Sequence, residues 1–216
     1  DKEVLKNINL TVNEKDRIGL IGINGCGKTT LLRILTGKEL PDRSTEKDGI
    51  VSFASKTSVG YLEQMSGLDR DSTVIDEMKS VFSYLDSVLE RMKELEHIMK
   101  ESSEINEEIS EEYSKLSAYY ESNDGYTIDV KIKTILNGMG FSENDYNRII
   151  SGFSGGEKTR LAIAKLLLEE PNLLILDEPT NHLDFKTVLW LEEYLKDYKG
   201  ALLIVSHDRY FLDKVV

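Results

Sequence analysis

Short apolar runs and helical stretches alternate in the first and last thirds of the chain. The runs at 18–21, 173–176 and 201–205 contain no charged residue. Such runs are typical of parallel strands that are buried on both faces. Two shorter strand candidates lie at 50–53 and 59–62. An earlier strand is indicated by the apolar residues Val4, Ile8, Leu10 and Val12.

Helical spacing follows two of these runs. Apolar residues recur at helical intervals from Thr29 to Leu35, and Gly37 marks the end of that helix. A second helix is predicted after Asp184, whose carboxylate can cap it, and Gly200 is expected to close it. Strands that alternate with helices predict an α/β domain with a parallel sheet.

The middle of the chain has a different period. Two series of apolar residues at spacings of three and four predict two helices, with a break around Ser102 and Ser103. We expect an antiparallel hairpin, inserted in one domain that spans 1–216. The core is then 1–71 with 150–216, and the helical subdomain is 72–149. The first series is Leu85, Val88, Met92, Leu95 and Met99, and the second is Ile105, Ile109, Tyr113, Leu116 and Tyr120.

The negative charge of the chain is concentrated in this helical insertion. Between residues 86 and 124, four basic and twelve acidic side chains give a net charge of −8, out of −12 for the whole chain. We interpret the segment as a solvated helical surface, because binding a polyanion requires a basic face.

Other global features favour a cytoplasmic protein that does not insert into a membrane. The one cysteine, Cys26, excludes an intramolecular disulfide and suits a reducing cytosol. No apolar stretch approaches the roughly 20 residues that span a bilayer, and no signal-peptide pattern opens the chain.

A glycine-rich segment after the first apolar run fits the phosphate-binding P-loop pattern. Its glycines let successive backbone amides point at phosphates, and the next helix adds its positive N-terminal end. Lys28 would reach the β- and γ-phosphates of ATP, and the Thr29 hydroxyl would ligate Mg²⁺. A turn without a ligand is disfavoured by the strand before the segment and the helix after it. The predicted nucleotide-binding residues are Gly22, Asn24, Gly25, Cys26, Gly27, Lys28, Thr29 and Thr30.

Acidic and polar residues follow three other strands. Asp177 and Glu178 come directly after the run at 173–176, at the strand end where open α/β sheets bind ligands. Asp177 would hold Mg²⁺ through water, and Glu178 would polarise the attacking water. Gln64 and His207 also end strands, so they are further candidates for catalysis at the γ-phosphate.

The segment Ser154-Gly155-Gly156-Glu157 has two interpretations. As a capping box, its serine and glutamate would satisfy two backbone donors. That leaves the glycines unexplained, because each costs up to about 1 kcal/mol against alanine in a helix. A phosphate bound at this helix N-terminus would require the close backbone approach that glycine permits.

The order of these motifs resembles that of ATP-binding-cassette (ABC) ATPases over essentially the whole chain. In that family they correspond to the Walker A loop, Q-loop, signature, Walker B and switch histidine, and 181–184 corresponds to the D-loop. The resemblance implies a P-loop NTPase fold with a parallel-sheet core, a small antiparallel β subdomain and an inserted helical subdomain. It implies that Gln64 also serves the metal. The signature residues Ser154, Gly155, Gly156 and Glu157 would then serve the ATP of a second cassette.

Within the family, the chain is most similar to the first cassette of ABC-F proteins. The residues that carry this resemblance are 181–184, 206–213 and the helical hairpin. It implies a longer chain with two cassettes and no membrane domain, which acts on ribosomes as a translation or antibiotic-resistance factor. The family's aromatic platform for adenine lies upstream of a segment like Val4-Leu5-Lys6-Asn7, so we expect it to be missing here.

Two other functions stay open at this point. The ATPase subunit of a membrane transporter would need a groove for a coupling helix, and the heptad hairpin argues against one. A nucleotide-gated binding module with little turnover is disfavoured by Glu178 and His207. The isolated chain is expected to be monomeric and nearly inactive, because the ATP on its P-loop lacks an opposing signature.

Overall fold

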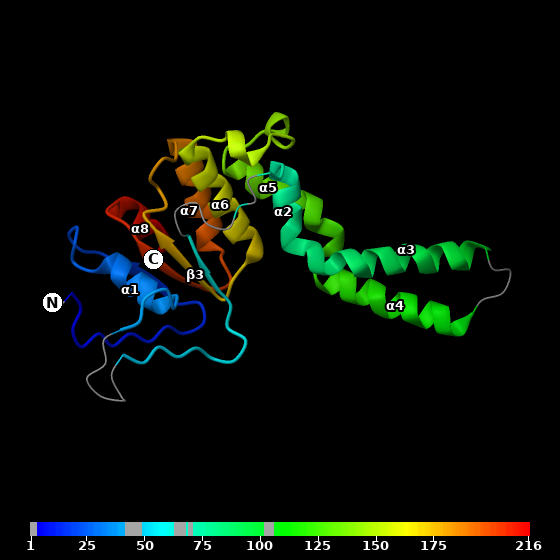
Figure 1. Ribbon diagram of the computed structural model, residues 1–216, viewed down its shortest axis with the longest axis horizontal. Helices are drawn as coiled ribbons and strands as arrows, with labels where there is room; N and C mark the ends of the chain where they lie inside the picture. The colour runs from blue at the N-terminus through cyan, green and yellow to red at the C-terminus, as the bar shows by residue number, and fades with distance from the viewer. Residues whose placement is uncertain (1–3, 42–48, 63–67, 69–70, 102–105) are drawn as a thin grey trace. The chain divides into compact units, whose positions relative to one another are not determined.

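The computed structural model describes the chain as two compact units (Figure 1). The first unit contains residues 1–68, 138–140 and 153–216, and the second contains 69–137 and 141–152. The residues that are described are 4–41, 49–62, 68, 71–101 and 106–216.

A four-stranded sheet lies at the centre of the first unit. Its order is β1-β4-β3-β2, and every neighbouring pair is parallel. The parallel α/β core that the sequence predicts is thereby confirmed, and all four strands end at the same edge. The strands are β1 (Arg17–Leu20), β2 (Val59–Tyr61), β3 (Leu173–Asp177) and β4 (Ala201–Val205).

Helices cover this sheet, and the hydrophobic core lies between the layers. Leu32 of α1 packs against one face, where alternate residues of β3 and β4 such as Ile175 and Leu203 form a buried cluster. The residues between them, such as Leu174 and Ile204, are fully buried too, as is expected of strands covered on both sides. The helices of this unit are α1 (Lys28–Leu35), α6 (Gly155–Glu169), α7 (Phe185–Lys196) and α8 (Arg209–Val215).

Two of the predicted strands do not form in the described part of the chain. Neither 4–12 nor 50–53 pairs with another segment there, so the small antiparallel subdomain is not seen. The physical reason is the lack of a buried face. Ile8, Ile50 and Phe53 are 53%, 63% and 47% exposed, and a strand is stabilised by packing on its neighbours more than by its own propensity.

Gly200 has a different role from the predicted one. Helix α7 already ends at Lys196, and Gly200 comes directly before β4. A Cβ at Gly200 would lie 2.6 Å from the carbonyl oxygen of Pro171 and 2.7 Å from that of Asn172. Glycine is therefore required here by the close approach of two backbone segments.

The second unit is helical. The hairpin predicted in the middle of the chain is formed by α3 and α4, whose apolar stripes pack together. Leu85, Met92 and Tyr120 are its buried core, and Arg91 joins the helices through Glu112, with an Nε–Oε1 distance of 2.7 Å. The helices are α2 (Val74–Lys79), α3 (Asp86–Glu101), α4 (Glu107–Ser122) and α5 (Ile128–Gly138), with short 3-10 turns η1 (Ser80–Leu85), η2 (Gly125–Thr127), η3 (Glu143–Asp145) and η4 (Ile150–Gly152).

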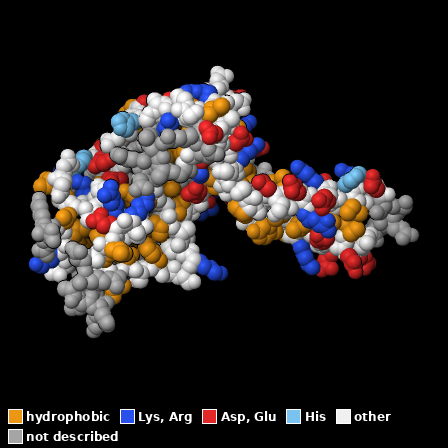
Figure 2. Space-filling model, in the orientation of Figure 1, with side chains coloured by type: hydrophobic (Ala, Val, Ile, Leu, Met, Phe, Trp, Pro, Cys, Tyr) orange, Lys and Arg blue, Asp and Glu red, His pale blue; other side chains and the backbone are white. Residues whose placement is uncertain are grey.

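The far end of the hairpin packs less tightly than its base. Met99 is 36% exposed, so the predicted stripe loses its packing toward the connection between α3 and α4. The predicted break at Ser102 and Ser103, together with Ile105, lies outside the described residues. Acidic and basic side chains are interleaved on the hairpin surface (Figure 2). Within the described ranges, no helix has the length and apolar character that crossing a bilayer requires.

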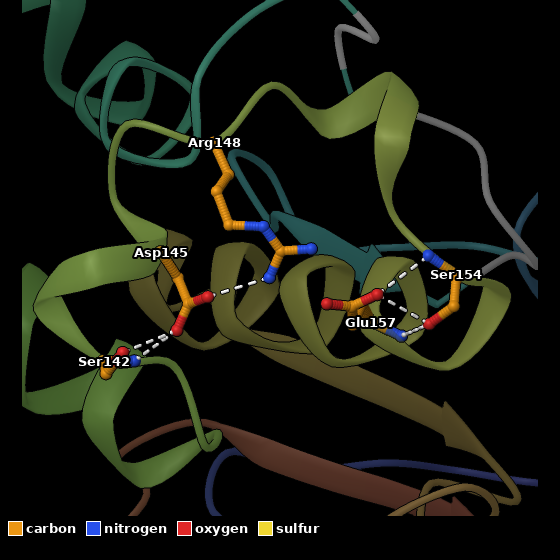
Figure 3. A network of polar contacts seen from close by, with 5 residues as sticks. All are labelled: Ser142, Asp145, Arg148, Ser154 and Glu157. Atoms are coloured by element: carbon orange, nitrogen blue, oxygen red, sulfur yellow. Dashed lines mark hydrogen bonds and ion pairs between the residues drawn. The ribbon is translucent and has the colours of Figure 1, made fainter.

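A carboxylate network at the surface organises the end of the second unit. Asp145 Oδ2 accepts hydrogen bonds of 2.8 Å from both the backbone N–H and the hydroxyl of Ser142. Its Oδ1 pairs with Arg148 Nη1 at 2.8 Å (Figure 3). Arg148 and the two donors of Ser142 lower the pKa of Asp145 from 3.8 to about 2, because all of them favour the ionised form.

The stability of the second unit is expected to depend on this carboxylate. A lowered pKa means that its contribution is fully present above about pH 4 and disappears as the pH falls through about 2. Asp145→Asn should therefore cost about 1–2 kcal/mol of unfolding free energy at pH 5, allowing for partial solvent screening. Urea unfolding at pH 5 and at pH 2.5 tests this, since the difference from wild type should shrink at the lower pH. Asp129→Asn is the control, because Asp129 is 74% exposed at 3.7 Å from Lys79. An equal loss at both pH values would contradict the assignment.

Candidate functional site

The predicted P-loop connects β1 to α1 at the carboxyl edge of the sheet. Gly25 and Gly27 have φ angles of 79° and 97°, which are accessible to glycine at little cost and strained for other residues. Gly27 is the N-cap of α1 and has no side chain to offer. The first amides of the helix therefore have no side-chain acceptor from the cap position, which leaves them suited to an anion.

Lys28 places a positive charge over this loop. Its ammonium donates hydrogen bonds to the carbonyl oxygens of Gly22 at 2.7 Å and Ile23 at 3.1 Å. The Sγ atom of Cys26 packs against Gly22, at 2.6 Å from where a Cβ of Gly22 would lie. Cys26 is exposed and fills the space beside a glycine that cannot be replaced without moving it.

Thr29 and Asp177 meet across the edge of the sheet. The hydroxyl of Thr29 donates to Asp177 Oδ2 at 3.3 Å, although the two residues are 148 positions apart. A hydroxyl and a carboxylate are the hard oxygen donors that Mg²⁺ prefers, and Mg²⁺ usually keeps several waters besides. The donor set thus fits the predicted metal. Gln64, the third predicted metal ligand, lies outside the described residues.

Glu178, His207 and Asn24 form a polar cluster beside the P-loop. His207 follows β4, and its Nε2 lies 2.8 Å from Asn24 Oδ1 and 3.4 Å from Glu178 Oε1. The backbone N–H of His207 donates to Glu178 Oε2 at 3.3 Å. The imidazole therefore bridges the P-loop and the acidic residue that follows β3. The sequence places Asn24 in the P-loop, but the motif does not reveal the contact of its side chain with His207.

The carboxylate of Glu178 is only partly satisfied. Its Oε1 is buried and makes no hydrogen bond to any described residue. His207 Nε2 lies 3.4 Å from this oxygen, but it forms its hydrogen bond with Asn24 Oδ1. The backbone is also strained, with φ at 49°, and it is held there by the hydrogen bond from its N–H to Val205 O at 2.8 Å. Strain and an unpaired polar atom at one residue are typical of a functional position.

The segment 154–157 begins α6 in the same unit. Ser154 and Glu157 form the predicted capping box, since the serine hydroxyl donates to Glu157 Oε2 at 2.8 Å and accepts from Glu157 N at 3.3 Å (Figure 3). The two glycines have no such internal role. A Cβ at Gly155 would meet nothing within 4 Å, and one at Gly156 would meet only His182 Cβ at 3.7 Å. Packing inside this chain does not require either glycine.

Comparisons with known proteins agree with this geometry. The family model described as ABC transporter matches residues 5–181. The chain is 48% identical to the putative ATP-binding protein YdiF of Bacillus subtilis, over 99% of this chain and 33% of that protein. It is 38% identical to the tylosin resistance ATP-binding protein TlrC of Streptomyces fradiae, over 100% of this chain and 39% of that protein.

A translation factor and a solved cassette are also similar. The energy-dependent translational throttle protein EttA of Haemophilus influenzae is 36% identical, over 99% of this chain and 37% of that protein. The dimeric structure of MJ0796, a bacterial ABC transporter cassette, aligns with a TM-score of 0.60 and 22% identity, over 98% of this chain and 83% of that one. The chain spans 33% to 41% of the length of the first curated relatives that it matches.

The strained backbone of Glu178 can be measured. The free energy of unfolding should be higher for Glu178→Gly than for Glu178→Ala, by up to about 1 kcal/mol, because glycine adopts a positive φ without steric cost. Both variants lose the same carboxylate, so their difference isolates the backbone. Thermal or urea unfolding of the two variants measures it, and a less stable glycine variant would contradict the strain.

Proposed function

Because this chain belongs to the ABC transporter family, in which such domains are ATPases, we propose that it is one cassette of a two-cassette ABC-F protein. In this proposal the full-length protein hydrolyses ATP and acts on ribosomes in the cytoplasm. The likeness to EttA and TlrC supports the ABC-F assignment. The single observation that carries the ATPase mechanism is the contact of His207 with both Asn24 and Glu178.

We assign the triphosphate to the P-loop, residues 22–29. Successive amides and the ammonium of Lys28 would bind the β- and γ-phosphates, with Thr30 further along the same helix turn. Thr29 and Asp177 would bind Mg²⁺, with Gln64 as a further ligand that the resemblance to the family implies. The metal ion would neutralise charge on the phosphate oxygens. Of the groups assigned to the metal, Thr29 and Asp177 meet at the carboxyl edge of the sheet, and Gln64 lies outside the described residues.

Glu178 is assigned as the residue that orients and deprotonates the attacking water. Its buried Oε1 has no hydrogen-bond partner among the described residues, so it is able to accept one from water. His207 holds the other oxygen through its backbone N–H. We assign its imidazole, which contacts Asn24 of the P-loop, to sensing the γ-phosphate of bound ATP. General-base catalysis of this kind requires the base within hydrogen-bond distance of the water.

A second cassette completes the site in this proposal. The glycines of 154–157 lie at the start of α6, where Gly155 is exposed and Gly156 is partly exposed. Packing does not need either of them, whereas a phosphate approaching the helix N-terminus would. Ser154, Gly155, Gly156 and Glu157 would therefore bind the ATP held by the P-loop of the partner cassette. The isolated chain should accordingly be a monomer with little turnover.

The assignment of Glu178 predicts a separation of binding from turnover. In the full-length protein, Glu178→Gln should reduce ATP hydrolysis by at least about 100-fold while nucleotide affinity is retained, since an amide keeps the shape but is a poor base. Lys28→Ala should lose nucleotide affinity, because it removes the charge that faces the phosphates. Calorimetry and phosphate release measure the two effects, and near wild-type turnover of Glu178→Gln would refute the role.

The same Glu178→Gln protein distinguishes the ABC-F function from that of a transporter ATPase. If the trapped ATP state co-sediments with ribosomes and wild type does so less, the ribosomal role is supported. Retention by membranes instead, through a membrane-embedded partner, would support the transporter alternative.

The proposed role of the signature predicts that one substitution changes stability and activity in opposite directions. Gly156→Ala should keep or raise the unfolding free energy, by up to about 1 kcal/mol, since alanine favours a helix and has room here. ATP hydrolysis by the full-length protein should fall nevertheless, while ATP still binds the P-loop of this cassette. Gly152→Ala, at a glycine that also has open space around its Cβ position, is the control outside α6. Unchanged turnover in Gly156→Ala would argue against a phosphate at this helix.

A further inference from the structure

The imidazole of His207 lies between two hydrogen-bond acceptors. Its Nε2 is 2.8 Å from Asn24 Oδ1 and 3.4 Å from Glu178 Oε1. An ionised carboxylate can only accept a hydrogen bond, whereas the amide of an asparagine can either donate or accept one. Nε2 must therefore carry a hydrogen, and the amide of Asn24 must turn its oxygen toward the ring. This holds for the neutral imidazole and for the imidazolium alike.

The one N–H at Nε2 serves only one of these acceptors well. Its distance to Asn24 is that of a full hydrogen bond, and its distance to Glu178 is beyond the usual range. The donor is thus directed to the P-loop and withheld from the carboxylate. Glu178 Oε1 is buried and makes no hydrogen bond to any described residue, which is the expected consequence.

Asn24 is also the polar group that orients the ring. His207 follows the end of β4, and its side chain is 50% exposed. Among the residues that the structure describes, no hydrogen bond reaches its Nδ1. Without the acceptor of Asn24, the ring could turn its Nε2–H to Glu178. A carboxylate is a charged acceptor and forms the stronger hydrogen bond of the two.

We propose that Asn24 is a positioning residue, whose side-chain oxygen keeps the Nε2–H of His207 away from Glu178 Oε1. The inference rests on the proposed function, because it matters only if that oxygen accepts a hydrogen bond from the attacking water. A donor from His207 at Oε1 would occupy the lone pairs that the water and its proton require. Asn24 also leaves the N–H on the side of the P-loop, to which we have assigned the triphosphate.

Asn24→Leu tests this role in the full-length protein, because leucine has nearly the same shape and no acceptor. With Mg²⁺ present, the kcat of ATP hydrolysis should fall by about tenfold or more, as part of what a general base contributes. The affinity for a non-hydrolysable ATP analogue should stay within about threefold, because backbone amides and Lys28 bind the phosphates. Asn24→Ala should give the same result without adding an apolar side chain to the loop.

The matched control is Asn9→Ala. Asn9 is exposed, and its side chain donates to the carbonyl oxygen of Asn7 at 3.4 Å, away from the polar cluster. This variant should change neither kcat nor affinity. Phosphate release and isothermal titration calorimetry measure the two quantities, and thermal melting establishes that each variant is folded.

A crystal structure of the Asn24→Ala protein supplies a measurement that a general disturbance of the loop would not produce. The distance from His207 Nε2 to Glu178 Oε1 should shorten from 3.4 Å to that of a hydrogen bond, about 2.7–3.2 Å. The same distance should not change in Asn9→Ala.

Three results would overturn the inference. The first is an unchanged kcat in both Asn24 variants, and the second is a parallel loss of kcat and nucleotide affinity, which would mean that Asn24 supports the loop or binds the nucleotide. The third is a distance from Nε2 to Oε1 that does not shorten in Asn24→Ala. In each case, loss of turnover in Glu178→Gln leaves the proposed function standing. Wild-type turnover in Glu178→Gln would instead refute the proposed function itself.

Discussion

The parallel pairing of β3 with β4 is the constraint on which the candidate site depends. In this register Asp177 lies beside Val205, so the residues that follow the two strands are Glu178 on one and Ser206-His207 on the other. The hydrogen bond from Glu178 N to Val205 O extends the pairing by one residue, to a position where the backbone has a positive φ of 49°. Slipping the register by one residue would reverse the faces of every side chain in the buried strands. The core therefore holds the strained residue in place.

The pairing of β1 with β4 then brings the P-loop to the same edge. Leu20 lies beside Val205, so the loop begins next to the segment that carries His207. Lys28 supplies the positive charge, and Asp177 and Glu178 supply the negative charges. A hydrophobic sheet thus collects opposite charges and glycine-lined backbone at its end, where solvent can reach them. This is the arrangement by which open α/β sheets bind charged ligands.

The second unit is stabilised by different interactions. Its hairpin has a small apolar core at the base and polar contacts across the helices, such as that of Arg91 with Glu112. Exposed ion pairs of this kind contribute little to stability, so the packing of Leu85, Met92 and Tyr120 has to determine the pairing of the helices. The excess of acidic residues on the hairpin argues against its acting as a general RNA-binding surface.

The sequence by itself determined the parallel α/β core, the helical hairpin and the identity of the chemical groups. Buried runs such as 201–205 and glycine spacing such as 22–27 are local signals, because backbone sterics and burial act on near neighbours. Only the tertiary structure decided what meets across long separations. The contact of His207 with Asn24 spans 183 positions, and no local pattern records it. The same reason explains the misassigned strands at 4–12 and 50–53, since a strand requires a partner and a buried face that its own residues do not specify. Gly200 likewise looked like a helix cap, and the carbonyl oxygens of Pro171 and Asn172, distant in sequence, are what require it.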